Sequence, residues 1–209
     1  GEYLKVGGST DTNLYYVVSG SLRLYFEDEF EEQTIRLAYR ENFIAALDSF
    51  ISDQASDIYI QALKKTQVKM LTKSAYLDLI NSSVENLHLW HQSMLQLIYE
   101  QLEREKDILT FSPLKRYQRV LKRSPQLFQE IPHKYIASYL RMTPETLSRI
   151  KKSWFESRFG VYKSWNFAAL NTWKTEVGRK KSDFDILITH KIELQNENIK
   201  RVTDWRPHQ

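Results

Sequence analysis

The chain has 209 residues, of which 42% are hydrophobic and 27% are charged, an ordinary composition for one large or two small globular domains. No apolar run approaches the roughly 18 residues needed to cross a bilayer, so we expect no membrane partner. The chain has no cysteine, which excludes disulfides, thiolate metal sites and cysteine-ligated iron–sulfur clusters and favours a cytoplasmic location.

The charge is unevenly distributed along the chain. Residues 1–112 hold 10 lysines and arginines against 17 acidic residues, a net charge of −7. Residues 113–152 hold 10 against 2, a net charge of +8, and residues 153–209 hold 10 against 7, a net charge of +3. A basic segment of this kind is typical of a phosphate-binding module, and the alternative is a solvated basic face.

The first 70 residues alternate apolar and polar side chains in short runs, which predicts strands. The predicted strands are 14–18, 21–26, 34–39, 57–63 and 66–71. The acidic residues 27–32 predict a solvated hairpin loop, and residues 42–50 are helix-like. Several short strands at regular spacing indicate a sandwich or barrel.

Helical periodicity begins after the strands. We predict a short helix over 75–81, capped by Ser74, and a long helix over 84–110, capped by Ser83. The long helix carries two apolar rows at seven-residue spacing, made by Leu87, Met94 and Ile108 and by Leu95, Leu102 and Leu109. Two rows indicate one face packed on the β domain and another on a partner helix; the alternative is one wide buried face.

A basic amphipathic helix follows over 114–122, with Leu114, Tyr117, Val120 and Leu121 on its inner side, and Ser124-Pro125 ends it. Residues 131–150 then predict two short helices joined by a tight turn. The second helix opens with Thr143-Pro144-Glu145, a cap followed by proline at the first helical position. This layout predicts a helix-turn-helix, which places one helix in the major groove of DNA.

The order of a β domain, a long helix and a helix-turn-helix resembles the Crp/Fnr family of bacterial transcription regulators. Two stretches carry the resemblance: residues 14–25, LYYVVSGSLRLY, and residues 136–150, IASYL followed by TPETLSRI. The resemblance implies an α+β fold. It would comprise an N-terminal cyclic-nucleotide-binding-like β-roll (jelly roll), a long dimerisation helix, and a C-terminal winged-helix-type helix-turn-helix domain. The expected boundaries are 1–82, 83–111 and 112–152, with an extension at 153–209.

The resemblance assigns base reading to Glu145 and Arg149, which lie four residues apart and so project on one side of the helix. Glutamate accepts a hydrogen bond from the cytosine amino group, and arginine donates two to guanine. The other expected DNA contacts are Thr143, Thr146, Ser148, Lys134, Arg141 and Lys152. We expect the two threonines and the serine to contact phosphates or to act as caps, and helix capping is the alternative role for Glu145. We expect Ala137, Leu140 and Leu147 in the core.

Two departures from the family pattern stand out. Arg141 occupies a turn position where the family has glycine, and a left-handed backbone there is less favourable for arginine. Residues 43–48 lack the Gly-Glu pair of cyclic-nucleotide binders, and residues 53–60 contain no arginine to hold a cyclic phosphate. We therefore expect a pocket for an unknown small-molecule effector, other than cyclic AMP, lined by Phe43, Ala45, Ala46, Ser56 and Tyr59. Cofactors, haem and metal are not indicated, because His88 and His91 suit a surface or an interface.

Residues 153–209 contain Trp154, Trp165, Trp173 and Trp205, and here we predict a strand over 184–190 and a partner strand over 199–202, with a turn at 196–198. A wing-like extension, a dimer element and a small separate unit are all consistent with this tail.

The sequence thus predicts a homodimeric regulator that reads an inverted-repeat operator in double-stranded DNA, with RNA polymerase as a further partner. The expected dimer interface is Leu87, His91, Met94, Leu95, Ile98, Leu102 and Leu109. The alternative is an effector-binding or protein-interaction module with vestigial DNA binding. We do not expect an enzyme, because no nucleophile–base pair, metal-spaced cluster or phosphate loop occurs.

Overall fold

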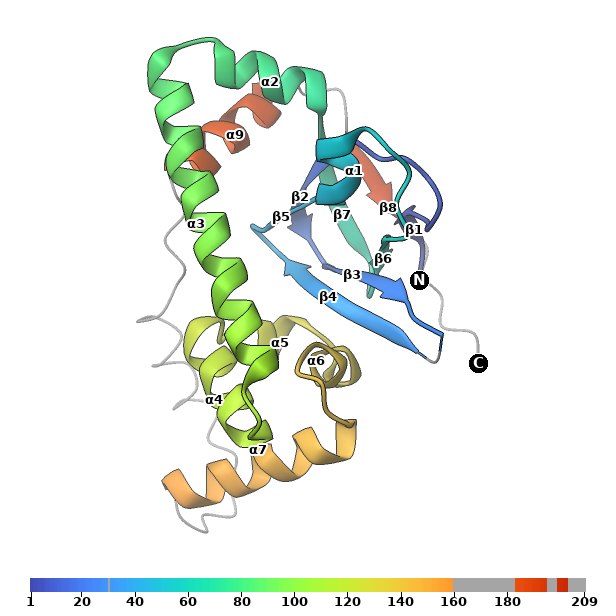
Figure 1. The fold of residues 1–209 in the computed structure, drawn as a ribbon, viewed down its shortest axis with the longest axis vertical. Coiled ribbons are helices and arrows are strands. Elements are labelled where there is room, and N and C mark those ends of the chain that lie inside the picture. Colours follow the sequence, from blue (N-terminus) through green and yellow to red (C-terminus); the bar gives the residue numbers. More distant parts are fainter. Residues whose placement is uncertain (30, 160–182, 195–198, 203–209) are drawn as a thin grey trace. The chain divides into compact units, whose positions relative to one another are not determined.

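The computed structural model describes residues 1–29, 31–159, 183–194 and 199–202. The chain divides into two compact units, which we call unit 1 (residues 1–99 and 181–209) and unit 2 (residues 100–180) (Figure 1). Unit 2 is therefore inserted into unit 1 along the sequence.

Unit 1 is built from two antiparallel four-stranded sheets (Figure 1). One sheet has the order β1-β6-β3-β4 and the other β5-β2-β7-β8. The strands are β1 Tyr3–Lys5, β2 Asn13–Ser19, β3 Ser21–Glu27, β4 Glu32–Tyr39, β5 Phe43–Ile44, β6 Tyr59–Ala62, β7 Thr66–Thr72 and β8 Ile199–Val202. The predicted strands within residues 14–71 are confirmed; the predicted loop is shorter than expected, because Glu32 already belongs to β4 and pairs with Arg23.

The core of unit 1 lies between the two sheets. Leu22 and Leu24 from β3, Ile60 from β6 and Val17 from β2 are buried there in one apolar cluster. Successive side chains of a strand point to opposite faces, so this cluster uses every second residue, as the alternation in the sequence predicted. The turn between β2 and β3 requires Gly20, whose φ is 90° and whose missing Cβ would meet Thr66.

The helices of unit 1 partly correct the sequence prediction. Residues 42–50 were expected to be helical throughout, but Phe43–Ile44 form β5 against β2, and α1 covers only Leu47–Ser52. Pairing with an available strand edge outweighs the local pattern there. The next helix, α2, spans Lys73–Asn81 and is capped by Thr72, whose hydroxyl accepts from the Ala75 amide, instead of by Ser74.

The long helix α3 spans Val84–Leu109 and runs from unit 1 into unit 2. Its predicted cap is confirmed, because the Ser83 hydroxyl accepts from the Asn86 amide at 3.1 Å.

In the tail, the described residues 183–194 and 199–202 belong to unit 1, and one prediction there is wrong. Residues 184–190 were expected to form a strand, but α9, Asp183–Leu194, is a helix. Its Ile188 is 3% exposed and packs with Tyr16, Leu71 and Tyr76. A short apolar run is compatible with either a strand or a buried helix. Packing of Ile188 on the apolar cluster beside α2 favours the helix here.

The other tail strand is confirmed with a different partner. Residues 199–202 form β8, which pairs antiparallel with β7. The chain after unit 2 therefore returns to complete the second sheet of unit 1. The predicted turn at 196–198 and Trp165, Trp173 and Trp205 lie outside the described residues.

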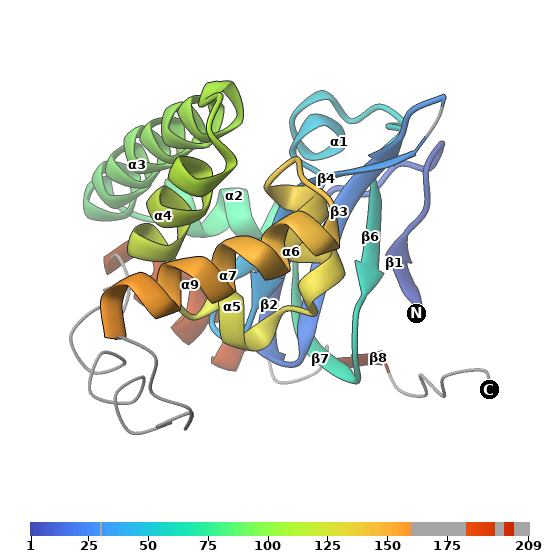
Figure 2. The same ribbon diagram turned by 90° about the horizontal axis from the view of Figure 1, so that it is seen from below.

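The described part of unit 2 is helical (Figure 2). After the end of α3 come α4 Pro113–Arg123, α5 Leu127–Glu130, α6 His133–Tyr139 and α7 Pro144–Phe159. Their core consists of the buried residues Tyr117, Val120, Leu127, Ile131, Ile136, Ala137, Leu140 and Leu147.

Two details of this core bear on the sequence prediction. Ala137, Leu140 and Leu147 are buried as expected, whereas Leu114, assigned to the inner side of α4, is 41% exposed. Trp154 packs edge-on against Tyr117 at 6.1 Å between ring centroids, so α7 continues into the segment that the sequence assigned to the tail.

Candidate nucleic-acid interface

The turn between α6 and α7 has a left-handed residue where the sequence suggested one. Arg141 has a φ of 54°. The Met142 amide donates to the Ala137 carbonyl at 3.1 Å, and the Arg141 amide donates to the Ser138 carbonyl at 3.0 Å. This is a Schellman-type helix end, in which glycine is the usual left-handed residue. Arginine adopts the conformation here, and a side chain from another helix contacts the same turn.

That contact comes from Arg116 in α4. Its Nε donates to the Leu140 carbonyl at 2.9 Å and its Nη2 to the Arg141 carbonyl at 3.0 Å. A cation beside the last carbonyls of a helix also interacts favourably with the helix dipole. Arg116 was missed at the level of sequence because nothing local distinguishes it from the other cations of α4.

Thr143 caps α7. Its hydroxyl accepts from the Thr146 amide at 3.2 Å, and its carbonyl accepts from the Leu147 amide at 3.0 Å. Of the two roles that the sequence left open for Thr143, capping is therefore present in the structure. Thr146 is half-buried and shares a hydroxyl contact with Thr143 at 3.1 Å.

Four of the predicted DNA contacts form one exposed row on α7. Glu145, Ser148, Arg149 and Lys152 are exposed and follow each other at spacings of three, one and three residues. Residues three, four and seven apart lie on one side of a helix, so the row faces a single direction. Leu147 and Ile150, at intervening positions, are buried and half-buried.

The ionised form of the Glu145 carboxylate is stabilised at the start of α7. Its own backbone N–H, then the Thr143 hydroxyl and the charge of Arg149, hold its pKa below the usual value. It therefore stays an ionised acceptor at neutral pH, as base reading of cytosine requires. The same contacts serve helix capping, so both roles are compatible with this geometry.

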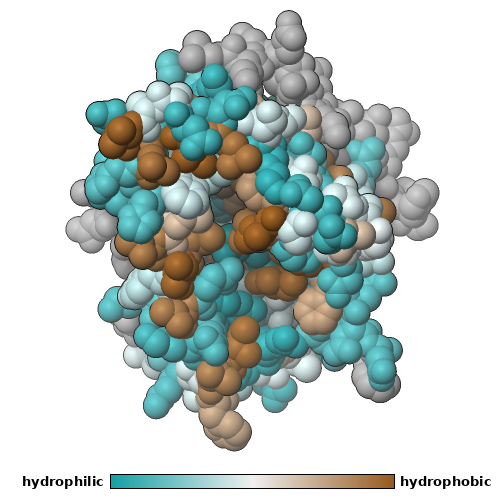
Figure 3. Space-filling view, turned by 45° about the horizontal axis from the view of Figure 1, so that its top comes forward, coloured by the Kyte–Doolittle hydropathy of each residue, from teal (hydrophilic) through white to brown (hydrophobic). Residues whose placement is uncertain are grey.

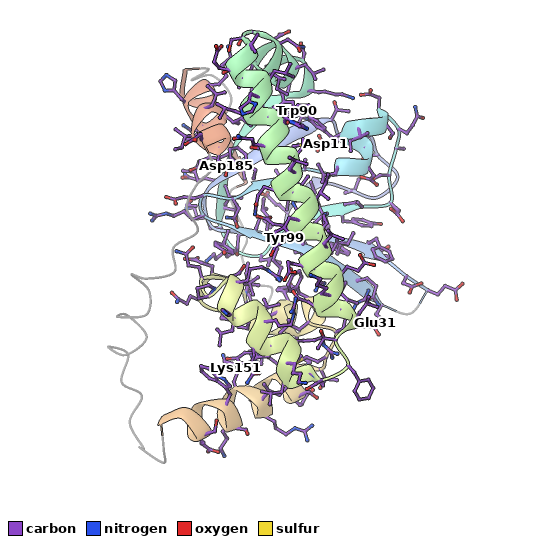
Figure 4. All side chains as sticks on the ribbon, turned by 60° about the vertical axis from the view of Figure 1, so that its left-hand side comes forward. Asp11, Glu31, Trp90, Tyr99, Lys151 and Asp185 are labelled. Atoms are coloured by element: carbon purple, nitrogen blue, oxygen red, sulfur yellow. The ribbon has the colours of Figure 1, made fainter. Side chains whose placement is uncertain are left out.

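Unit 2 carries three more cations on the helix-turn-helix. Arg141 and Lys134 are exposed, and the Lys134 ammonium lies 4.7 Å from the centre of the Tyr135 ring. Lys151, labelled on α7 in Figure 4, is half-buried, and burial lowers its pKa. Burial and the charge of Lys151 together lower the pKa of His133, the first residue of α6, so this histidine is neutral at pH 7. No pattern in the sequence pointed to this pair.

The expected dimer residues lie along α3. The side chains of Leu95, Ile98, Leu102 and Leu109 are 56%, 58%, 51% and 74% exposed, and Leu87 is 46% exposed. His91 is exposed and Met94 is half-buried. Apolar side chains are visible among hydrophilic ones on the outside of the molecule (Figure 3).

The exposed residues of α3 also follow a regular spacing. Every position of a row with alternating spacings of four and three residues is exposed: Val84, His88, His91, Leu95, Ile98, Leu102, Glu105 and Leu109. This spacing is the a/d repeat of a two-stranded coiled coil. By contrast, Leu89 and Trp90 pack against the apolar cluster of unit 1 that includes Ile188. The N-terminal part of α3 therefore has one covered face and one open face.

The predicted effector-pocket residues do not share one set of contacts. Phe43 packs on Tyr16 with 5.0 Å between ring centroids, whereas Ala46 belongs to the core between the sheets. Tyr59 stacks on Tyr25 at 4.9 Å. The two remaining residues are Ala45, which is buried, and Ser56, whose carbonyl accepts from the Lys5 ammonium at 3.0 Å.

The inner strands of unit 1 hold one buried cation that sequence reasoning did not assign. Arg23 is 5% exposed, donates to the Gln61 side chain at 2.8 Å and pairs with Glu32. Its guanidinium also lies 3.9 Å from the centre of the Tyr25 ring. Within the described residues, no group of three or more histidine, aspartate or glutamate side chains could hold a metal ion. None of the helices that the structure describes is long and apolar enough to cross a membrane.

Comparison with known proteins finds similar structures but no match at the level of sequence families or curated proteins. No family model matches the sequence, and no curated protein matches it either. FixK2 from Bradyrhizobium japonicum has a similar structure, with a TM-score of 0.58 at 15% identity over 90% of this chain and 91% of that one. TTHB099, a transcriptional regulator of the CRP family from Thermus thermophilus, gives 0.55 at 15% identity over 86% and 96%. A CooA variant from Carboxydothermus hydrogenoformans gives 0.55 at 16% identity over 91% and 84%.

These similarities show that the chain has the fold of Crp/Fnr regulators, a β-roll of the cyclic-nucleotide-binding type followed by a helix-turn-helix domain. The predicted fold class and the resemblance are thereby confirmed.

Proposed function

We propose that this chain is a sequence-specific DNA-binding transcription regulator. The observation that carries the proposal is the exposed row of Glu145, Ser148, Arg149 and Lys152 on α7. A helix that presents an ionised carboxylate and a guanidinium on one side has the acceptor and the two-pronged donor that read cytosine and guanine in the major groove.

The surrounding cations supply sequence-independent affinity. Lys134 and Arg141 are exposed on the helix-turn-helix, and residues 113–152 carry a net charge of +8. Contacts from such cations to phosphates position a protein on the duplex without specifying sequence. Binding should therefore weaken steeply as salt concentration rises.

We propose that the regulator is a homodimer that joins through the exposed a/d row of α3. The a/d row of α3 exposes five apolar residues, so this helix is incompletely buried as a single chain; they are Val84, Leu95, Ile98, Leu102 and Leu109. Two copies related by a twofold axis would present two α7 helices to two half-sites about one DNA turn apart.

The input signal differs from cyclic AMP in this proposal. Residues 53–60 contain no arginine, and the buried Arg23 already binds Glu32 and Gln61. A cyclic phosphate therefore lacks the two-pronged cation that would hold it. Calorimetric titration with cyclic AMP should show no binding, and saturable binding would contradict this part of the proposal.

The central experiment is selection of binding sites from random double-stranded DNA, which should return an inverted repeat. Arg149→Ala should then weaken binding to the selected site by about 1–3 kcal/mol and relax the preference at one base pair of each half-site. Lys122→Ala is the matched control, because it removes an exposed cation of the same basic segment from α4 instead of α7. Equal effects of the two substitutions on sequence preference would refute base reading by Arg149.

Dimerisation is tested separately by sedimentation. Ile98→Glu places a charge in the a/d row and should produce monomers, whereas Gln101→Glu changes an exposed position of α3 outside that row and should not. A wild-type protein that sediments as a monomer would refute the homodimer. A dimer that binds no DNA at low salt would favour the alternative, an effector-binding module with vestigial DNA binding.

A further inference from the structure

A buried carboxylate joins the last turns of α3 to α4. Asp107 is fully buried, and its two carboxylate oxygens accept from Arg119 Nε at 2.8 Å and from Arg123 Nη2 at 2.5 Å. One turn earlier, the Glu103 carboxylate accepts from Arg119 Nη2 at 2.9 Å and from Lys106 Nζ at 2.8 Å. All these residues belong to unit 2.

Two further junctions connect the same end of α3 to the helix-turn-helix. The Arg104 guanidinium lies 3.7 Å from the centre of the Tyr139 ring in α6. The Arg116 guanidinium, which holds the turn before α7, also donates through Nη1 to the Thr110 carbonyl at 2.7 Å and to the Phe111 carbonyl at 3.2 Å. One side chain thus bridges the end of α3 and the turn that starts α7.

These junctions are better suited to fixing geometry than to adding stability. Taking charged groups out of water offsets most of the attraction between them, so apolar side chains would stabilise the same contact as well or better. The hydrogen bonds of these groups instead restrict their positions. The Arg116 guanidinium donates to four carbonyls, and the Asp107 carboxylate accepts from two arginines, so each keeps its bonds only within a narrow range of geometries. These contacts connect the end of α3 to α4, to α6 and to the turn before α7.

The same stretch of α3 carries part of the a/d row. Leu102 and Leu109 are exposed, whereas Asp107, between them, is buried against α4. If two copies join through this row, the position of each α7 relative to the dimer axis is set by the junctions just described. The consequence for DNA is geometric, because inserting one base pair between half-sites separates them by about 3.4 Å and rotates them by about 35°.

We infer that Asp107 and Arg116 are positioning residues that determine which spacing between operator half-sites the protein accepts. The inference rests on the proposed homodimeric DNA-binding function. Neither residue needs to touch DNA, and their contribution differs from that of Glu145 and Arg149, which choose the bases within each half-site.

The test uses the full chain and a series of duplexes in which the spacer of the selected inverted repeat is shortened or lengthened by one or two base pairs. Wild-type protein should lose about tenfold or more in affinity for each base pair of change. Asp107→Asn and Arg116→Lys should flatten this profile to within about threefold while keeping the preference for the half-site sequence. Arg149→Ala is the matched contrast, because it should lower affinity at every spacing and leave the shape of the profile unchanged.

A merely structural role predicts a different result. Variants that fold, dimerise and keep the wild-type spacing profile would overturn the inference, whatever their thermal stability. If Asp107→Asn does not fold, the spacing profile of Arg116→Lys tests the inference by itself. Arg116 is only half-buried, and lysine keeps the positive charge but lacks the several N–H donors of the planar guanidinium. A wild-type dimer that binds all spacings equally well would overturn this inference and leave the proposed function standing. A wild-type monomer would instead refute the proposed homodimer, on which the inference rests.

Discussion

The tail offers the sharpest test of how unit 1 is built. Ile188 of α9 is 3% exposed and packs with Tyr16, Leu71 and Tyr76, whereas Ile186 of the same helix is 54% exposed. Ile188→Ala and Ile186→Ala therefore delete the same atoms from two environments. If α9 is part of the unit 1 core, only the first deletion should destabilise that unit strongly.

The magnitude follows from what is removed. Three buried carbon atoms correspond to about 2.4 kcal/mol of transfer free energy, and the remaining cavity raises the expected loss for Ile188→Ala to about 3 kcal/mol. Ile186→Ala should lower the free energy of unfolding by about 0.5–1 kcal/mol or less. With a denaturant slope of about 1–3 kcal/mol per molar urea, Ile188→Ala should lower the urea midpoint of unit 1 by about 1–3 M.

Hydrogen exchange makes the assay specific to unit 1. The amides of β7 bond to β2 and β8, so their exchange reports opening of the sheet that the tail completes. Ile188→Ala should speed exchange in β7 and leave the amides of α6 and α7 in unit 2 unchanged. Equal losses of stability for the two alanine variants would refute the packing of α9 on this cluster.

Three other predictions concern unit 2. Because the pKa of His133 in the folded protein lies below its ordinary value of 6.5, the unfolded chain binds protons more readily; the free energy of unfolding should therefore fall as pH drops below about 6.5. His133→Gln should flatten this dependence in denaturation curves measured from about pH 7.5 to 5.5, and an unchanged slope would exclude His133 as its source. Arg141→Gly should raise the free energy of unfolding by about 0.5–1 kcal/mol, because glycine adopts a φ of 54° without strain. The same variant should bind DNA less tightly and reduce the salt slope by about one, and a loss of stability on denaturation would show that the left-handed backbone is not strained. Thr143→Ala removes the cap of α7 and should lower the thermal stability of unit 2 by about 1 kcal/mol, whereas Thr143→Ser should retain it; equal melting of the two variants would argue against the cap.

Much of the fold could be predicted from local pattern because its signals are local. The alternation of β3 follows from the two faces of a strand, and the caps Ser83 and Thr143 are visible as polar residues just before helical runs. The α7 row could be predicted for the same reason, since its four residues lie within three turns of one helix. Ala137, Leu140 and Leu147 were assigned to the core correctly because a short helix-turn-helix has few ways to bury its apolar residues.

What local pattern could not supply depends on partners distant in sequence. Residues 184–190 were assigned to a strand because an apolar run has no period of its own, and only the surface beside α2 selects the helix α9. Asp107 has the sequence context of any acid on a charged helix, and its role arises from Arg119 and Arg123, 12 and 16 residues later. The same holds for Arg116, whose acceptors at Leu140 and Arg141 lie 24 and 25 residues away.

The sequence by itself therefore determined the strands within residues 14–71, the long helix and the residues exposed on α7, because each depends on residues close together in the chain. The tertiary structure decided how that surface is held. It showed which cation stabilises the left-handed Arg141, which carboxylate is buried under α4, and that the chain after unit 2 returns to complete the β7 edge of unit 1. Burial and long-range hydrogen bonds select among local alternatives that the linear pattern leaves equal.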